Sequence, residues 1–157
     1  MNNILSYKIV QAHCDVPCGI YDPSTAQIAA LSVARFLNLI ADIDDLNNIE
    51  NLARLNRLVQ EKETHAGKVK SEIVIIWGDY FKEAQIEICP DIHNLTHSIL
   101  REASKCKQET AQENGPELVR LVNEFTKAFW LTKGIETESH TSPYEPSLPL
   151  VRPILSN

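Results

Sequence analysis

The stretch LVRLVNEFTKAFW, residues 118–130, carries the clearest structural signal in the sequence. Its apolar residues recur at the intervals i, i+3, i+4, i+7 and i+11, which is the spacing of one face of an α-helix. The residues on that face are Leu118, Leu121, Val122, Phe125 and Phe129. An amphipathic helix of this kind has to bury its apolar face against other elements. The rest of the chain therefore has to supply partners for it.

Three earlier segments show the same helical spacing. Asp22 followed by Pro23 is typical of a helix start, and the helix it opens should end near residues 42–45. A second helix is predicted from about Asn47 to Trp77, with a possible bend or break at Gly67, and a third from Asp91. Residues 78–90 lack helical periodicity and should form a long connection. We therefore expect an all-α protein, an antiparallel up-and-down four-helix bundle over residues 23–133.

The last part of the chain, residues 134–157, has a different composition. It contains Pro143, Pro146, Pro149 and Pro153, which rule out regular helix. We expect an extended C-terminal tail that either wraps a neighbouring subunit or stays disordered, and of the two we favour disorder.

Composition excludes several classes of protein. A chain of 157 residues with 43% hydrophobic residues suits one domain. The net charge is −6 and no run of Lys or Arg forms a basic stripe, so we expect no nucleic-acid partner. No stretch approaches the roughly 18 consecutive apolar residues of a membrane span, and residues 1–12 lack the features of a secretory signal. The four cysteines are not needed to stabilise a fold of this size, which favours reduced thiols and a cytoplasmic location.

The segment HCDVPCGIYDP, residues 13–23, concentrates the metal-binding chemistry. His13, Cys14 and Cys18 place one imidazole and two thiols within six residues, and such ligands suit zinc, copper or nickel. Pro17 restricts the backbone and Gly19 permits positive φ, so the loop between the sulfurs can be a preset turn. The pair of cysteines alone also fits a structural metal half-site, a redox-sensing pair or thiols without a role.

This segment resembles, almost position for position, the metal-binding hook of the nickel superoxide dismutases. Two further stretches resemble the same family: WGDYFK at residues 77–82 and FWLTK at residues 129–133. The resemblance thus spans roughly residues 13–133. It implies that a leader, residues 1–12, is removed between Ala12 and His13, and that residues 13–22 form the nickel hook.

The resemblance implies one nickel ion per chain and disproportionation of superoxide to dioxygen and hydrogen peroxide by Ni(III)/Ni(II) cycling. The ligands would be the α-amine and imidazole of His13, the backbone nitrogen of Cys14, and the sulfurs of Cys14 and Cys18. Removal of the leader has a physical reason. An amide nitrogen is a poor metal ligand, whereas the free α-amine that the cut creates is readily deprotonated by a metal.

Other residues would support the nickel site. By resemblance, Tyr21 and Tyr80 lie near the metal and order water or restrict access, and Asp15 shapes the pocket. Lys82 is a candidate for attracting the superoxide anion to an acidic protein. In family members, a carboxylate and an arginine can hydrogen-bond the imidazole of the ligand histidine. This chain has Ala29 and His65 at the corresponding positions. His65 is thus either a substitute partner or a surface histidine.

The family also implies partners: a homohexameric assembly, a leader-cleaving protease and a nickel chaperone. Two other functions remain open from the sequence. Cys14 and Cys18 with His93 and His97 have the ligand types of a structural zinc site in a helical protein, although most of the bundle separates the two halves. Alternatively, the chain is a metal-free helical interaction module whose thiols sense oxidants.

Overall fold

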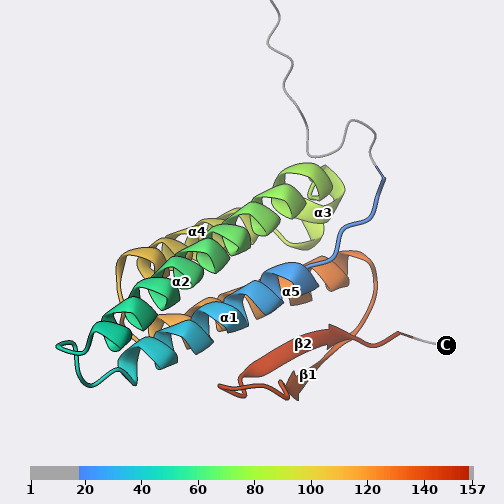
Figure 1. Ribbon diagram of the computed structural model, residues 1–157. Coiled ribbons are helices and arrows are strands. Elements are labelled where there is room, and N and C mark those ends of the chain that lie inside the picture. Colours follow the sequence, from blue (N-terminus) through green and yellow to red (C-terminus); the bar gives the residue numbers. More distant parts are fainter. Residues whose placement is uncertain (1–17, 156–157) are drawn as a thin grey trace, which may run out of the picture.

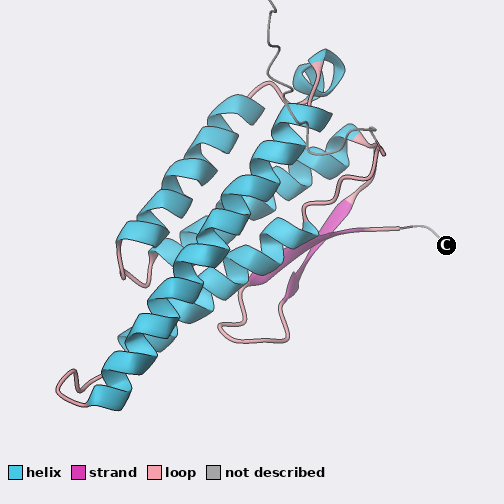
Figure 2. Cartoon of the chain, turned by 45° about the horizontal axis from the view of Figure 1, so that its top comes forward, coloured by secondary structure: helices cyan, strands magenta, loops and turns pink. Residues whose placement is uncertain are grey.

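Helices make up most of the protein in the computed structural model, which describes residues 18–155 (Figure 1). The elements in chain order are α1 (Ser24–Ala41), α2 (Ile49–Ile75), the π-helix η1 (Ile76–Tyr80), α3 (Glu83–Ile88), α4 (Ile92–Gln108), α5 (Asn114–Thr132), β1 (Thr137–Thr141) and β2 (Pro149–Pro153). The four long helices run in alternating directions, and each packs against two others: α1 on α2 and α5, α4 on α2 and α5 (Figures 1 and 2). The predicted helical bundle is confirmed.

Helix α1 lies within the bundle and supplies much of its core. Among the described residues 18–155, it is the one helix long and apolar enough to cross a membrane by length and composition. Nine of its residues are buried, and they pack within the bundle: Ala26, Gln27, Ala29, Ala30, Leu31, Val33, Ala34, Leu37 and Ile40. The apolar character of α1 is thus explained by packing against α2 and α5.

Helix α1 begins at Ser24 and α2 at Ile49, one and two residues after the predicted starts at Pro23 and Asn47. The Asp22 carboxylate accepts a hydrogen bond from the Ser24 backbone N–H at 2.7 Å, at the start of α1. At the start of α2, the Asn48 side chain accepts one from the Glu50 N–H at 2.8 Å. Both contacts satisfy N–H groups that have no partner inside the helix. Gly67, the possible break, lies inside α2 without interrupting it.

The start of α5 approaches the middle of α1 closely. A Cβ added at Gly115 would lie 2.6 Å from the Ala34 Cα and 2.9 Å from its Cβ. Only glycine therefore fits at this crossing. Gly115 and Pro116 both lie in the first turn of α5, where proline is tolerated because its missing N–H would be unpaired anyway.

Replacing Gly115 with alanine should destabilise the protein by about 1–3 kcal/mol, because the new methyl group meets the backbone of α1 rather than a movable side chain. Urea denaturation measures the free energy of unfolding. The matched control is Gly67→Ala, where no heavy atom lies within 4 Å of the added Cβ. That change should stabilise α2 by about 0.5–1 kcal/mol. Equal effects of the two substitutions would contradict the close approach.

The connection after α2 differs from the prediction of a long irregular segment. Residues 76–80 form the π-helix η1, and residues 83–88 form the short helix α3. Periodicity could not reveal them, because η1 departs from the 3.6-residue repeat and α3 spans under two turns. The Gln85 side chain accepts from the Lys82 N–H at 3.1 Å and so caps α3.

The predicted C-terminal disorder is wrong for most of residues 134–157. Strands β1 and β2 pair antiparallel, with Thr137 opposite Pro153 and Thr141 opposite Pro149 (Figure 2). The hairpin packs on α5, and Leu150 and Val151 are buried with exposures of 3% and 2%. The expectation of extended backbone is correct, because prolines 149 and 153 stand at the two ends of β2, where a strand tolerates them.

Two buried amides tether β2 to the helices. The Gln27 amide on α1 donates to the Val151 carbonyl and to the Asn123 side-chain oxygen, both at 2.9 Å. Asn123, on α5, donates to the Pro149 carbonyl at 2.7 Å and accepts from the Val151 N–H at 3.2 Å. These bonds satisfy the edge of β2 that β1 does not cover, so the hairpin belongs to the folded core.

Substituting Asn123 with alanine should cost about 1–3 kcal/mol of stability, because the Val151 N–H and the Pro149 carbonyl lose their partner. Hydrogen exchange should show faster exchange at the Val151 amide. Lys127→Ala, an exposed position one turn further along α5, serves as the control and should change neither quantity appreciably. Unchanged exchange at Val151 in the Asn123 variant would show that the amide does not hold the strand.

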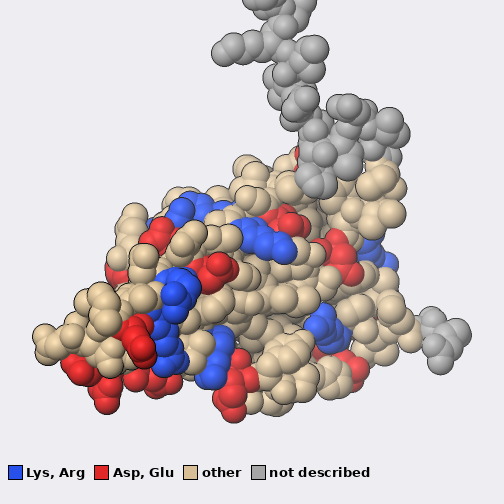
Figure 3. All heavy atoms as spheres, in the orientation of Figure 1, with Lys and Arg blue, Asp and Glu red and all other residues tan. Residues whose placement is uncertain are grey.

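Acidic and basic side chains intermix over the helices on the face drawn in Figure 3. On α5, for example, Arg120 pairs with Glu117 at 2.6 Å and with Glu124 one turn further on. Such exposed pairs contribute little to stability, typically under about 1 kcal/mol.

Candidate metal centre

Most of the predicted nickel ligands fall outside the described residues. The structure describes residues 18–155, so it does not include the predicted ligands His13 and Cys14. The supporting residues Asp15 and Pro17 also lie outside the described residues. Cys18 is described, and its thiol is exposed and forms no disulfide. An exposed, unoxidised thiol beside the first helix has the state that a metal-binding thiolate requires.

Gly19 follows Cys18 directly and adopts the left-handed conformation with φ +71°. The sequence predicted that this glycine can take positive φ, and the structure confirms it. A residue with a Cβ would be strained at this φ. The turn leads from Cys18 into Tyr21 and the start of α1, so the rigid helix fixes where the thiol-bearing segment begins.

Tyr21 and Tyr80 meet at the end of the bundle where α1 begins. Their ring centroids are 5.8 Å apart, although 59 positions separate them in the sequence. Tyr21 precedes α1, whereas Tyr80 is the last residue of η1. Both tyrosines were predicted to lie near one site, and the structure brings their rings together. Tyr21 is also only three residues from Cys18 in the sequence.

Tyr80 is held by contacts on several sides. Its ring packs against Phe129 with centroids 4.8 Å apart and against Phe81 at 5.3 Å. The Lys133 ammonium lies 4.9 Å from the ring centroid, which is within the range of a cation–π contact. The Tyr80 hydroxyl is 2.7 Å from the Thr132 hydroxyl.

Thr132 and Lys133 were missed as site residues by sequence reasoning. They lie in FWLTK, the stretch that supported the family resemblance, but no pattern in that stretch singled them out. Their proximity to Tyr80 depends on how the end of α5 meets η1, which is a tertiary contact.

Lys82 lies just after η1 and is exposed. Its Nζ donates to the Gly78 carbonyl at 2.7 Å, so the side chain folds back over η1. The positive charge is therefore held near the end of the helix that carries Tyr80.

His65 is not brought to the tyrosine pair. Its Nδ1–H donates to the Glu61 carbonyl at 2.9 Å, and its ring lies 5.3 Å from the Phe36 ring. Phe36 lies 13 positions beyond Pro23 on α1, which is about 20 Å along the helix axis. Ala29, the other position in question, is buried in the core. Within one chain, His65 therefore stands far from the start of α1.

The remaining described cysteines, Cys89 and Cys106, are packing residues. Cys106 is fully buried, its Sγ donates to the Asn114 carbonyl at 3.5 Å, and burial raises its pKa to about 12. Cys89 is half-buried and donates to the Ala128 carbonyl at 3.6 Å, and burial raises its pKa as well. A thiol with a raised pKa is rarely the reactive thiolate, so neither residue suits an oxidant sensor.

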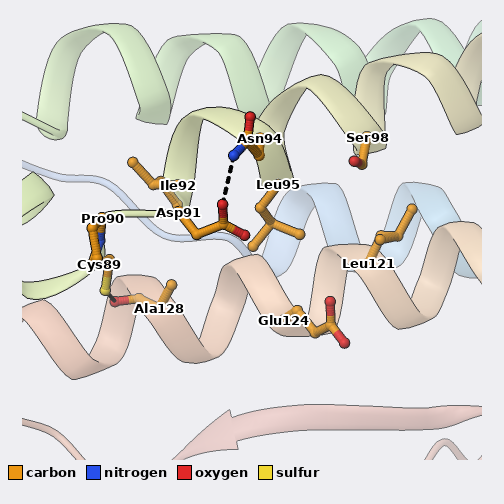
Figure 4. Close-up of a pocket in the computed structure, with 10 residues that line it drawn as sticks. All are labelled: Cys89, Pro90, Asp91, Ile92, Asn94, Leu95, Ser98, Leu121, Glu124 and Ala128. Carbon is orange, nitrogen blue, oxygen red and sulfur yellow. Dashed lines mark hydrogen bonds between the residues drawn. The ribbon is translucent and has the colours of Figure 1, made fainter.

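Cys89 lines the pocket of about 320 Å³ shown in Figure 4, between the start of α4 and α5. Asp91 and Glu124 also line it, and Asp91 accepts from the Asn94 amide at 2.7 Å. Within residues 18–155, however, no three His, Cys, Asp or Glu side chains gather so that they could hold a metal ion. This pocket therefore does not compete with the N-terminal segment as a metal centre.

The absence of such a group within residues 18–155 also argues against the structural zinc site. Its three described ligands, Cys18, His93 and His97, do not form a group. His93 instead accepts a hydrogen bond from the Trp77 indole N–H at 2.9 Å through its Nδ1.

The donor set fits nickel. One exposed thiol precedes a glycine turn, and the residues before it add a second thiol and an imidazole in the sequence. Nitrogen and sulfur ligands of this kind suit divalent nickel.

Comparisons with known proteins also point to nickel. The sequence model of the family described as nickel-containing superoxide dismutase matches residues 8–133. The superoxide dismutase [Ni] of Streptomyces seoulensis is 35% identical over 124 residues, 79% of this chain and 90% of that protein. The corresponding protein of Streptomyces coelicolor is 34% identical over the same shares.

Solved structures show the same fold. A nickel-containing superoxide dismutase with nickel ligation corresponding to the oxidised state superposes with a TM-score of 0.70 at 34% identity, covering 78% of this chain and 99% of that one. A mutant of the enzyme gives a TM-score of 0.70 at 32% identity, with the same coverage. The hairpin β1–β2 lies beyond the matched residues 8–133. The chain belongs to the nickel-containing superoxide dismutase family.

Proposed function

We propose that residues 13–22 bind the nickel ion of this enzyme, one ion per chain, through His13, Cys14 and Cys18. The protein is a nickel-dependent superoxide dismutase, which converts two superoxide anions and two protons into dioxygen and hydrogen peroxide. Nickel, when bound, supplies the one-electron oxidation and reduction that the two halves of this reaction need. Pro17 and Gly19 shape the turn that brings the two thiols together.

The aromatic residues at this end of the bundle guard the site. Tyr21 lies three residues after the last proposed ligand, Cys18, and contacts Tyr80, so the two rings would restrict access and order water beside the metal. Asp15 would shape the pocket from within the hook. Lys82 would offset the repulsion between superoxide and a chain with a net charge of −6.

The first 12 residues would act as a leader that keeps the site inactive. Cleavage between Ala12 and His13 turns the His13 nitrogen from an amide into an amine, which is a far better metal ligand. A protease must perform this cut, and a nickel chaperone would be a further partner.

We also propose a cytoplasmic location and a homohexameric assembly, because the composition lacks export features and the family resemblance implies six subunits. Light scattering on the processed protein measures the assembly directly. His65, which lies far from the start of α1 in its own chain, would reach a metal centre only from a neighbouring subunit.

The observation that carries the proposal is the match to the family over residues 8–133, which includes every proposed ligand. The test combines intact mass with elemental analysis on protein from a host that can process it. Nickel at one ion per chain and a first residue of His13 are expected. Zinc with an intact leader, or no metal at all, would overturn the proposal.

A further inference from the structure

A chain of two hydroxyl groups and a carbonyl links Tyr80 to the end of α5. The Tyr80 Oη lies 2.7 Å from the Thr132 Oγ1, which lies 2.6 Å from the Phe129 carbonyl oxygen. The first contact alone does not show which hydroxyl donates. The second does, because a carbonyl oxygen only accepts and the threonine hydroxyl has a single proton. Thr132 therefore donates to Phe129, and Tyr80 donates to Thr132.

We infer that Thr132 is a positioning residue that fixes the direction of the Tyr80 hydroxyl proton. The inference rests on the proposed function, in which Tyr80 lies beside the nickel site. With its proton committed to Thr132, the Tyr80 oxygen presents lone pairs to its other neighbours and acts there as an acceptor. Tyr80 thus orients a water molecule by accepting from it, and the two protons that convert superoxide to hydrogen peroxide come from groups other than the Tyr80 hydroxyl.

The neighbours of Tyr80 fix the position of its ring, so the direction of its hydroxyl proton is what Thr132 can still determine. Phe129 and Phe81 pack against its ring at centroid distances of 4.8 and 5.3 Å, and the Lys133 ammonium lies 4.9 Å from its centroid. The ring is therefore held in place without Thr132. Rotation about the C–O bond is opposed by the Thr132 contact, so removal of that one acceptor should change the proton direction and little else.

Raman spectroscopy of the metal-free protein tests the hydroxyl direction without any activity. The intensity ratio of the tyrosine Fermi doublet depends on whether the phenol donates or accepts, and subtraction of a Tyr80→Phe spectrum isolates Tyr80. We expect the lower-frequency component to lose intensity relative to the higher-frequency one in Thr132→Val, because Tyr80 then no longer donates to Thr132, and we expect the native ratio in Thr132→Ser. An unchanged ratio in Thr132→Val, or a ratio that shifts equally in Thr132→Ser, would overturn the inference.

Steady-state kinetics of the nickel-loaded variants tests the consequence. Thr132→Val should lower kcat by about tenfold with KM nearly unchanged, as expected when a hydrogen-bonding group is misoriented. Thr132→Ser keeps the hydroxyl and should have the native kcat. Native kcat in Thr132→Val would show that the residue has no positioning role. Failure of the proposed nickel site would appear separately, as native protein without nickel, and would leave the Raman result intact.

Discussion

Replacing Cys18 with serine should abolish nickel binding and leave the fold intact. A hydroxyl oxygen is a harder and weaker donor for nickel than a thiolate, and losing even a residue that only supports a ligand lowers metal affinity by about 10–100-fold. We therefore expect a loss above about 100-fold for the ligand itself. The Cys18 side chain is exposed, so the bundle core does not depend on it. Elemental analysis gives nickel per chain, and circular dichroism gives the helix content.

The matched control for this substitution is Cys89→Ser. Cys89 is half-buried, donates to the Ala128 carbonyl and lies outside the proposed hook, so this variant should keep its nickel. It tests whether a lost thiol as such affects the metal content. One nickel ion per chain in the Cys18 variant would remove that residue from the site.

The long helices were predictable because their signal is local. The apolar face of residues 118–130 lies in α5, where Leu118, Val122 and Phe125 are fully buried. The start of α1 near Asp22 was predictable for the same reason, since the residues that begin a helix are neighbours in the sequence. Each of these helices has an apolar face that must be buried against the others, so the outline of the bundle follows from periodicity.

The C-terminal hairpin was not predictable because its stability comes from distant residues. Prolines in a polar segment indicate a tail without regular structure. The buried amides of Gln27 and Asn123 hold β2, and these residues lie 124 and 28 positions from Val151. Nothing in the sequence of α1 distinguishes a buried glutamine with this role from an exposed one.

In the candidate site, too, some residues could be predicted from the sequence and others depend on contacts between distant elements. Tyr21 and Tyr80 were identified through the family resemblance, and they do meet. Thr132 escaped notice because its role depends on the approach of α5 to η1. His65 was a candidate by position in the sequence, but its place along α2 puts it beside Phe36 instead.

The full chain of residues 1–157 should fold but remain inactive, whereas a chain beginning at His13 should be active. The bundle lies in residues 24–132, so the leader is not needed for its core. In the full chain, the His13 nitrogen is an amide and cannot act as an amine ligand. An α-amine has a pKa of about 7.7–8.0, which allows a metal to displace its proton near neutral pH. We expect the activity per chain to differ by more than about 100-fold, which exceeds the effect of losing a supporting residue.

The sharpest control for the leader is a chain that begins at Ala12. It differs from the active form by a single residue and still has a free α-amine, but that amine belongs to Ala12 and the His13 nitrogen stays an amide. If the leader acted by covering the site, removing 11 of its 12 residues would restore most of the activity. If the His13 amine is a ligand, the Ala12 form should be as inactive as the full chain. Activity of the purified, uncleaved protein, with intact mass measured after the assay, would contradict the amine-ligand proposal, because the ligand set would then be complete without the cut.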